Sequence, residues 1–359
     1  MGQGSSGIDD RYFLQKVRLG QGSFGTVWRA VDRRSGTTVA VKQMDKDRMA
    51  RQGLRREHVE REIAMMRACC HENITQLYDT FEDGSCIFLA LEYCEGGDFG
   101  DKVRERGLGV REGEAAAWVQ QMCSAISFLH LKRICHRDIK PDNFMVSEGP
   151  SATNKESGAL KLADFGLAVF LPPGQVLSEK CGTPAFMSPE QHLLPKRSRG
   201  YGFPVDVWAA GISMYQIICG GRHPFLNDRG ILDHRLLLRG ELDFKADAQK
   251  VRSEGPDRFT SGLRFSDEAR ELCCRLVDRD ASRRISAREV VGSSWCSGAS
   301  QPALLRRTSA GASAGGGGGG LGVFGGGGAF GGGGAASCGF GAEFRGSPFA
   351  PSAAAAVAA

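Results

Sequence analysis

Apolar and polar residues alternate along the N-terminal part of the chain. The alternation covers residues 12–31, and short apolar runs follow at 38–42, 74–79 and Cys86–Glu92. A period of two, bounded by glycine and polar residues, predicts β-strands. We therefore expect a small region that is mainly β, with a glycine turn between its first two strands.

Helical spacing replaces this alternation over most of the remaining chain. Residues 47–70 predict a helix between the strands, Glu112–Leu131 a long helix, and the apolar stretch 207–221 a buried one. Further helices are expected up to Trp295. The pattern thus predicts an α+β fold with a small, mainly β part followed by a larger, mainly α part.

Three segments have neither pattern. Residues 1–11 are expected to be flexible, and the polar segment 147–158 is expected to form a surface insertion between two short strands. Residues 297–359 are rich in Gly and Ala with isolated Phe, and such a composition buries too little apolar surface to offset the entropy of ordering. We expect a disordered tail, which is either inert or weakly self-associating through its phenylalanines.

Composition limits the partners and the compartment. The 359 residues have a net charge of +5, and the basic residues are interspersed with acidic ones, so no nucleic acid is expected as a partner. The 12 cysteines are scattered and form no C-x-x-C ladder. Reduced thiols and a cytoplasmic location are therefore expected rather than zinc sites or a disulfide framework.

Membrane contact is expected only at the N-terminus. No run of about 18 apolar residues is present, so we predict no transmembrane segment, and the features of a signal peptide are missing. The first six residues match the acylation pattern M-G-x-x-x-S, which predicts weak membrane contact through myristoylated Gly2. A linker of small residues is the alternative, because no second anchor lies beside it.

Residues suited to phosphoryl transfer are concentrated in one segment. Residues 136–143 have the sequence H-R-D-I-K-P-D-N, and a D-F-G sequence begins at Asp164. Phosphoryl transfer needs positioning, a metal site and charge neutralisation. We expect Asp138 to accept the proton of the incoming hydroxyl, Lys140 to meet the charge on the phosphate, and Asn143 and Asp164 to hold the metal.

A glycine-rich loop is predicted between the first two strands. Its residues are Gly20, Gln21, Gly22, Ser23, Phe24 and Gly25, with Val27 shortly after. Glycine lets backbone N–H groups approach a phosphate closely. A dinucleotide-binding turn is the competing interpretation, but it needs a helix after the glycines. The β-branched and aromatic residues that follow favour a covering strand.

The combination of H-R-D-x-x-x-x-N with D-F-G is the catalytic signature of the protein kinases, and the chain resembles that family over about residues 12–296. The resemblance implies the bilobal kinase fold, with an N-lobe at 12–92, a hinge at 93–97 and a C-lobe at 98–296. It also implies ATP and Mg²⁺ as cofactors and proteins as substrates. Lysine at position 140 implies transfer to Ser or Thr rather than Tyr.

The resemblance also assigns the nucleotide site. Lys42 would hold the α- and β-phosphates, and Glu62 would pair with it, with Glu57 and Glu60 as alternative partners. The adenine pocket would be formed by Leu91, Glu92 and Cys94 at the hinge and by the apolar side chains of Val27, Ala40 and Met145.

Regulation is expected around Arg137. In this family an arginine before the catalytic base usually binds a phosphate on the activation segment, and Glu179 occupies the position of that phosphate. A carboxylate partly replaces a phosphate, so we hypothesise activity without phosphorylation there, with Ser178 as the rival switch. Thr183 is expected to contact Asp138 and to help seat the substrate hydroxyl.

Two carboxylates are expected to be structural. Glu190 ends an S-P-E sequence that replaces the family's usual A-P-E, and it should pair with Arg284 or, alternatively, Arg283. Asp206 should accept hydrogen bonds from the backbone of the catalytic loop, because a buried carboxylate needs such partners.

Substrate preference is expected from Asp98 and Asp142. Arginine–carboxylate pairing at these positions would favour sites with arginine upstream of the acceptor, and two solvated surface acids are the alternative. Phrases such as C-H-R-D-I-K-P-D-N-F are most similar to the calcium/calmodulin-dependent group, especially the catalytic modules of calcium-dependent protein kinases. No EF-hand loop is present, so direct calcium control is not expected.

Two other functions compete with this interpretation. One is a non-catalytic nucleotide-binding scaffold, which the presence of all the expected catalytic groups disfavours. The other is phosphotransfer to a small molecule, which the S-P-E sequence and Arg284 disfavour. Residues 246–263 depart from the family pattern because they are longer and more polar than expected.

Overall fold

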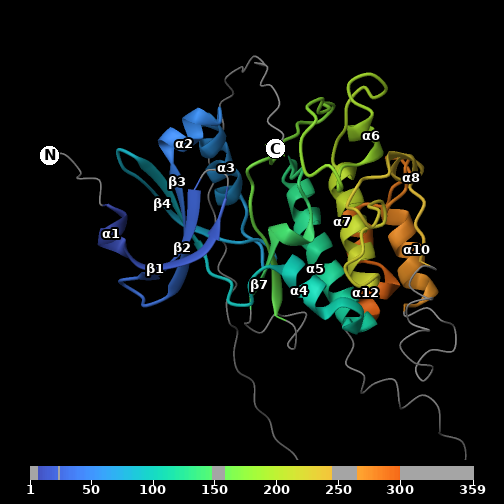
Figure 1. Ribbon diagram of the computed structural model, residues 1–359, viewed down its shortest axis with the longest axis horizontal. Helices are drawn as coiled ribbons and strands as arrows, with labels where there is room; N and C mark the ends of the chain where they lie inside the picture. Colours follow the sequence, from blue (N-terminus) through green and yellow to red (C-terminus); the bar gives the residue numbers. More distant parts are fainter. Residues whose placement is uncertain (1–6, 23–24, 148–157, 245–264, 300–359) are drawn as a thin grey trace, which may run out of the picture. The chain divides into compact units, whose positions relative to one another are not determined.

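The computed structural model describes residues 7–22, 25–147, 158–244 and 265–299. Several features predicted from the sequence lie outside these residues: Gly2, Ser23 and Phe24, most of the predicted insertion, the segment 246–263 and nearly all of the predicted tail. The described helices and strands nevertheless form both parts of the predicted α+β fold (Figure 1).

A five-stranded antiparallel sheet forms the first part, with the strand order β1-β2-β3-β5-β4. The strands are β1 (Tyr12–Gln21), β2 (Gly25–Asp32), β3 (Thr38–Asp45), β4 (Leu77–Glu82) and β5 (Cys86–Glu92). A short helix, α1 (Ile8–Arg11), precedes them, and Ile8 packs with Tyr12 in a small core against the sheet. The expectation of a small, mainly β lobe is confirmed.

The predicted strand at residues 74–79 is shifted in the structure. Residues before Leu77 pair with the other lobe: Thr75 N donates to Leu162 O at 3.0 Å, and Leu162 N donates to Asn73 O at 2.8 Å. The alternation of apolar residues along the chain does not indicate that residues 73–75 pair with Leu162. The predicted strand therefore begins three residues before the observed one, which begins at Leu77.

The predicted helix at residues 47–70 is two helices. They are α2 (Lys46–Arg51) and α3 (Arg56–Ala68). The chain turns at Gly53, whose φ of 72° lies in the left-handed region that favours glycine. The break lets Val59, Met65 and Met66 of α3 pack into the main hydrophobic core, while Glu62 of the same helix lies outside that apolar cluster.

The second part is mainly helical (Figure 1). Its helices are α4 (Phe99–Arg106), α5 (Glu112–Leu131), α6 (Pro189–His192), α7 (Pro204–Ile218), α8 (His234–Arg239), α10 (Asp267–Leu276), α11 (Ala287–Val291) and α12 (Ser294–Ala299). Helix α5 has the predicted bounds, and α7 is almost entirely buried. Trp118 and Trp208 are fully buried in the core that these two helices share.

Short strands in this part flank the H-R-D and D-F-G sequences. Strand β6 (Ile134–Cys135) pairs with β9 (Val169–Phe170), and β7 (Phe144–Ser147) pairs with β8 (Ala159–Leu162). Two single-turn 3₁₀ helices lie at Gly107–Gly109 and Pro141–Asn143. The β7–β8 pair confirms that the predicted insertion connects two short strands.

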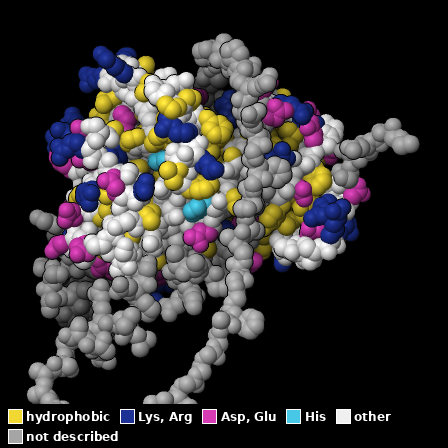
Figure 2. Space-filling model, turned by 180° about the vertical axis from the view of Figure 1, so that it is seen from behind, with side chains coloured by type: hydrophobic (Ala, Val, Ile, Leu, Met, Phe, Trp, Pro, Cys, Tyr) yellow, Lys and Arg dark blue, Asp and Glu magenta, His cyan; other side chains and the backbone are white. Residues whose placement is uncertain are grey.

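The face of the described part drawn in Figure 2 carries charges of both signs. Basic and acidic side chains are interspersed on the face drawn in Figure 2. Among the described residues, no helix combines the length and apolarity that crossing a bilayer requires. The cysteines in this part are free thiols, and most of them are buried.

Candidate active site

One face of the sheet carries the predicted nucleotide-site side chains. In the register of β2, β3 and β5, Val27 is opposite Lys42, and Ala40 is opposite Leu91. Because residues two apart along a strand point to the same face, these four side chains share one side of the sheet. Gly25 makes the approach of β2 and β3 feasible, since a Cβ there would lie 1.8 Å from the Gln43 carbonyl oxygen.

Lys42 joins two elements at this face. Its Nζ lies 2.7 Å from Glu62 Oε1 on α3 and 3.6 Å from Asp164 Oδ1 of the D-F-G sequence. Burial would lower the pKa of Lys42, but the two carboxylates outweigh it and raise that pKa above its ordinary value. Lys42 in turn lowers the pKa of Asp164, which remains ionised at neutral pH. The predicted partner Glu62 is present, whereas Glu60 pairs with Arg56.

Asp138 lies at the centre of a second polar group. Its Oδ1 accepts hydrogen bonds from the Thr183 backbone N–H (2.9 Å) and hydroxyl (2.7 Å). Its Oδ2 lies 3.0 Å from Lys140 Nζ and accepts from Asn143 Nδ2 at 3.0 Å. Burial raises the pKa of Asp138, but the Thr183 and Lys140 contacts outweigh burial and lower it overall. The Asp138 carboxylate is therefore ionised at neutral pH and can act as a hydrogen-bond acceptor.

A buried carboxylate on α7 fixes the catalytic loop. Asp206 accepts hydrogen bonds from the backbone N–H groups of His136 (2.9 Å) and Arg137 (2.8 Å), and His130 Nε2 lies 3.0 Å from it. The predicted structural role of Asp206 is therefore confirmed. Arg137 has a φ of 69°, and Asp164 has a φ of 58°. Such backbone conformations are costly for residues with a Cβ, and surrounding contacts of this kind hold them in place.

A cavity of about 320 Å³ connects the two polar groups. Of the predicted site residues it is lined by Gly22, Gly25, Val27, Lys42, Glu62, Asp138 and Asp164. Lys140 and Asn143 contact Asp138 but are not part of this lining. The other predicted site residues in the described part of the chain do not line this cavity either. They are Gly20, Gln21, Ala40, Leu91, Glu92, Cys94 and Met145.

The predicted hinge residues lie where β5 leaves the sheet. Glu92 forms an ion pair with Lys161 at 2.7 Å, and its side chain also accepts from Gln76 N at 3.2 Å. Cys94 is buried, which raises the pKa of its thiol to about 12, so the thiol is neutral. Met145 on β7 pairs through its backbone with Asp98 just after the hinge.

Arg137 binds the predicted activation segment, which covers residues 164–190, as expected from the sequence. Its Nη1 lies 3.0 Å from Glu179 Oε2, and its Nε donates to the Leu167 carbonyl oxygen at 2.7 Å. Tyr201 donates from its hydroxyl to the Glu179 carbonyl oxygen at 2.7 Å. Glu179 is thus held through both its side chain and its backbone.

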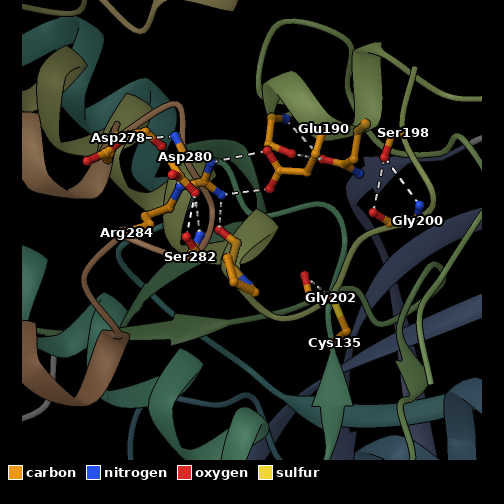
Figure 3. A network of polar contacts seen from close by, with 12 residues as sticks. Cys135, Glu190, Ser198, Gly200, Gly202, Asp278, Asp280, Ser282 and Arg284 are labelled. Atoms are coloured by element: carbon orange, nitrogen blue, oxygen red, sulfur yellow. Dashed lines mark hydrogen bonds and ion pairs between the residues drawn. The ribbon is translucent and has the colours of Figure 1, made fainter. Parts of the chain in front are cut away.

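The pairing of Glu190 with Arg284 is also confirmed. Figure 3 shows the two side chains facing each other. Arg284 Nη1 donates to Glu190 Oε1 at 2.8 Å, and its Nη2 donates to Oε2 at 3.1 Å. Arg284 additionally donates to the Pro204 carbonyl oxygen at 2.7 Å. The alternative partner, Arg283, lies 3.8 Å from Asp278 instead.

Sequence reasoning missed one residue near the predicted substrate carboxylates. Arg104 on α4 contacts Asp142 Oδ1 at 3.0 Å and Asp101 Oδ1 at 2.7 Å, and it lies 3.9 Å from Asp98. We call Asp98, Asp101 and Asp142 the α4 carboxylate cluster. The three-residue spacing from Asp101 to Arg104 on a helix was the available signal.

The five-stranded sheet of the first lobe and the mainly helical second lobe form a two-lobed α+β fold, and each polar group contains a lysine close to a carboxylate. Residues 13–296 match the family model described as the protein kinase domain. The chain belongs to the protein kinase family.

Similar proteins agree with this assignment. The chain is 34% identical over 297 residues to calcium-dependent protein kinase 10 of Arabidopsis thaliana, covering 82% of this chain and 49% of that protein. It is also 34% identical over 280 residues to calcium-dependent protein kinase 20 of Oryza sativa subsp. japonica, covering 77% of this chain and 46% of that protein. The chain therefore spans about half the length of the curated relatives it matches.

Proposed function

We propose that this chain is an active serine/threonine protein kinase that transfers the γ-phosphate of ATP to protein hydroxyl groups. Its catalytic domain would cover residues 12–296, divided into an N-lobe at 12–92, a hinge at 93–97 and a C-lobe at 98–296. The observation that carries the proposal is the lining of one cavity by Lys42, paired with Glu62, and by the carboxylates of Asp138 and Asp164.

The donor set suits Mg²⁺ together with a nucleotide. Asp164 is ionised, and Asn143 uses Nδ2 for both of its contacts with Asp138, so its amide oxygen is left for a metal. No group of three or more His, Cys, Asp or Glu that could bind a metal occurs among the described residues. This fits Mg²⁺, which is commonly bound by one or two carboxylates plus substrate phosphates. When bound, the metal would neutralise phosphate charge.

The chain's own residues would orient and activate the reactants. Lys42, aimed by Glu62, would hold the α- and β-phosphates, and the adenine would lie near Val27, Ala40 and Leu91. Asp138 would orient the substrate hydroxyl and accept its proton. Lys140 would stay beside the reacting oxygen, where its positive charge would stabilise the negative charge that develops on the phosphate.

The α4 carboxylate cluster supports a preference for arginine upstream of the phosphorylated residue. Asp98 and Asp142 both lie close to Gly100, where an added Cβ would be 3.0 Å and 2.9 Å from their Oδ1 atoms. A guanidinium matches this arrangement because its planar fork can bond to carboxylates through several N–H groups.

A degenerate peptide library with ATP and Mg²⁺ tests the proposal, with and without Ca²⁺. We expect phosphorylated Ser and Thr, enrichment of upstream arginine, and loss of transfer when Mg²⁺ is chelated. Nucleotide binding without phosphate transfer to any peptide would instead identify a non-catalytic scaffold.

A further inference from the structure

An arginine of the protein itself occupies the carboxylates proposed to bind the substrate. Arg104 Nη1 contacts Asp142 Oδ1 at 3.0 Å, while Nη2 contacts Asp101 Oδ1 at 2.7 Å. The third carboxylate, Asp98, caps the start of α4 by accepting from Asp101 N at 2.9 Å, and lies 3.9 Å from the guanidinium. The cluster therefore already holds the chemical group that it is proposed to recognise.

We infer that Arg104 is a specificity-determining residue that competes with the substrate's upstream arginine for the α4 carboxylate cluster. The inference rests on the proposed function, because it concerns the proposed substrate site. A substrate would have to displace Arg104 from Asp142, or share the cluster with it. Either route lowers the advantage that an upstream arginine gives to a peptide.

The contacts of Arg104 are of a kind that exchanges readily. Its side chain is 55% exposed, and those of Asp101 and Asp142 are 67% and 42% exposed. Exposed ion pairs are weak because water and salt screen them. The guanidinium also divides its N–H groups between two carboxylates instead of forming a two-pronged pair with one of them, which is the stronger arrangement.

The α4 carboxylate cluster carries more negative charge than Arg104 alone neutralises. Three carboxylates face one guanidinium. Burial is the main cause that raises the pKa of Asp98, and the negative charges of Asp142 and Asp101 add to it. An incoming guanidinium would therefore still be attracted, but more weakly than if Arg104 were absent.

The test compares kcat/KM for two peptides that differ only in having arginine or glutamine at the preferred upstream position. The variants are Arg104→Gln, which removes the competing charge, and Arg104→Lys, which keeps the charge but loses the planar fork. Lys102→Gln on the same helix is the matched control. Among the described residues, Lys102 forms no ion pair with the cluster.

We expect Arg104→Gln to raise the preference for the arginine peptide about threefold to tenfold, in line with two exposed ion pairs. Arg104→Lys should give an intermediate preference, and Lys102→Gln should match the wild type. If the wild type prefers arginine and Arg104→Gln does not change the ratio, or changes it only as much as Lys102→Gln, the inference is wrong while the proposed function stands.

Two other outcomes separate the inference from the proposed function. If only Arg104→Gln prefers the arginine peptide, the competition is stronger than expected, and the inference is supported. If neither the wild type nor Arg104→Gln discriminates, both the upstream-arginine preference and the inference fail. Transfer to the glutamine peptide would then still support kinase activity itself.

Discussion

The Lys42 group and the α4 carboxylate cluster use the same chemistry in different surroundings. In the first, two carboxylates contact Lys42, and in the second, three carboxylates lie near Arg104. The Lys42–Glu62 pair is shielded, with side chains 25% and 8% exposed, although Asp164 is 56% exposed. The Arg104–Asp101 pair is 55% and 67% exposed. Burial strengthens electrostatic interactions and limits exchange, while exposure weakens them and permits it.

This difference fits different tasks. The Lys42–Glu62 pair has to hold one geometry, because misplacing reactants is costly in phosphoryl transfer. According to our proposal, the α4 carboxylate cluster would release Arg104 and accept the arginine of a substrate. Both groups combine carboxylates with one cation, but the Lys42–Glu62 pair is shielded from solvent, and its cation is a lysine rather than an arginine.

The largest effect is expected for Asp138→Asn, which keeps the shape of the side chain but removes the proton acceptor. We expect a loss of about 10³-fold in kcat, within the range typical of general bases. Single-turnover kinetics would measure it, with Asp47→Asn on the exposed surface of α2 as the control. Retention of more than about a tenth of the activity would mean that Asp138 is not the base.

Glu62→Gln removes the charge of Glu62 without altering the size of its side chain. Lys42 could still donate to the amide oxygen, but its one remaining ionic partner in this group would be Asp164, at 3.6 Å. Because small misplacements can cost up to about 10²-fold, we expect kcat/KM for ATP to fall by about 10- to 100-fold. Glu60→Gln changes the alternative partner, which pairs with Arg56, and should have little effect. Equal losses in both variants would contradict the assignment of Glu62.

Glu179→Gln tests whether a fixed carboxylate replaces an activating phosphate. Arg137 would lose an ionic partner but keep its contact with the Leu167 carbonyl oxygen. Because the lost partner Glu179 is exposed, we expect kcat to fall only about threefold to tenfold. Lys180→Gln is the control. Phosphatase treatment of the wild type should leave activity intact; loss of activity that maps to Ser178 would overturn the hypothesis.

The sequence predicted most of the fold because its signals were local. Strand β5 and helix α5 have the predicted bounds, since apolar periodicity and flanking polar residues define them. The split between α2 and α3 was missed because a single glycine in a helical pattern does not reveal its φ. Strand β4 was misplaced because residues 73–75 pair with Leu162, far along the chain.

The proposed site was predictable only where a motif fixes the spacing. The motif predicted Asp138 and Asp164, and Glu62 was chosen over Glu60 from its sequence context. The contact between Arg104 and Asp142 could not be predicted in the same way, because it joins residues 38 positions apart without a motif. Tertiary packing of α4 on the catalytic loop creates it.

The smallest predicted effect is that of salt, which should separate the two charged groups directly. Raising ionic strength from about 0.1 M to 1 M shortens the screening length from about 10 Å to about 3 Å. We expect the preference for an arginine peptide over its glutamine counterpart to fall about twofold to threefold, because the α4 cluster is exposed. The kcat for the glutamine peptide at saturation should change less, since Glu62 and Asp138 are largely shielded from solvent. Two salts of different anions at equal ionic strength control for specific ion binding. A fall in kcat as large as the fall in preference would mean that burial does not distinguish the two groups.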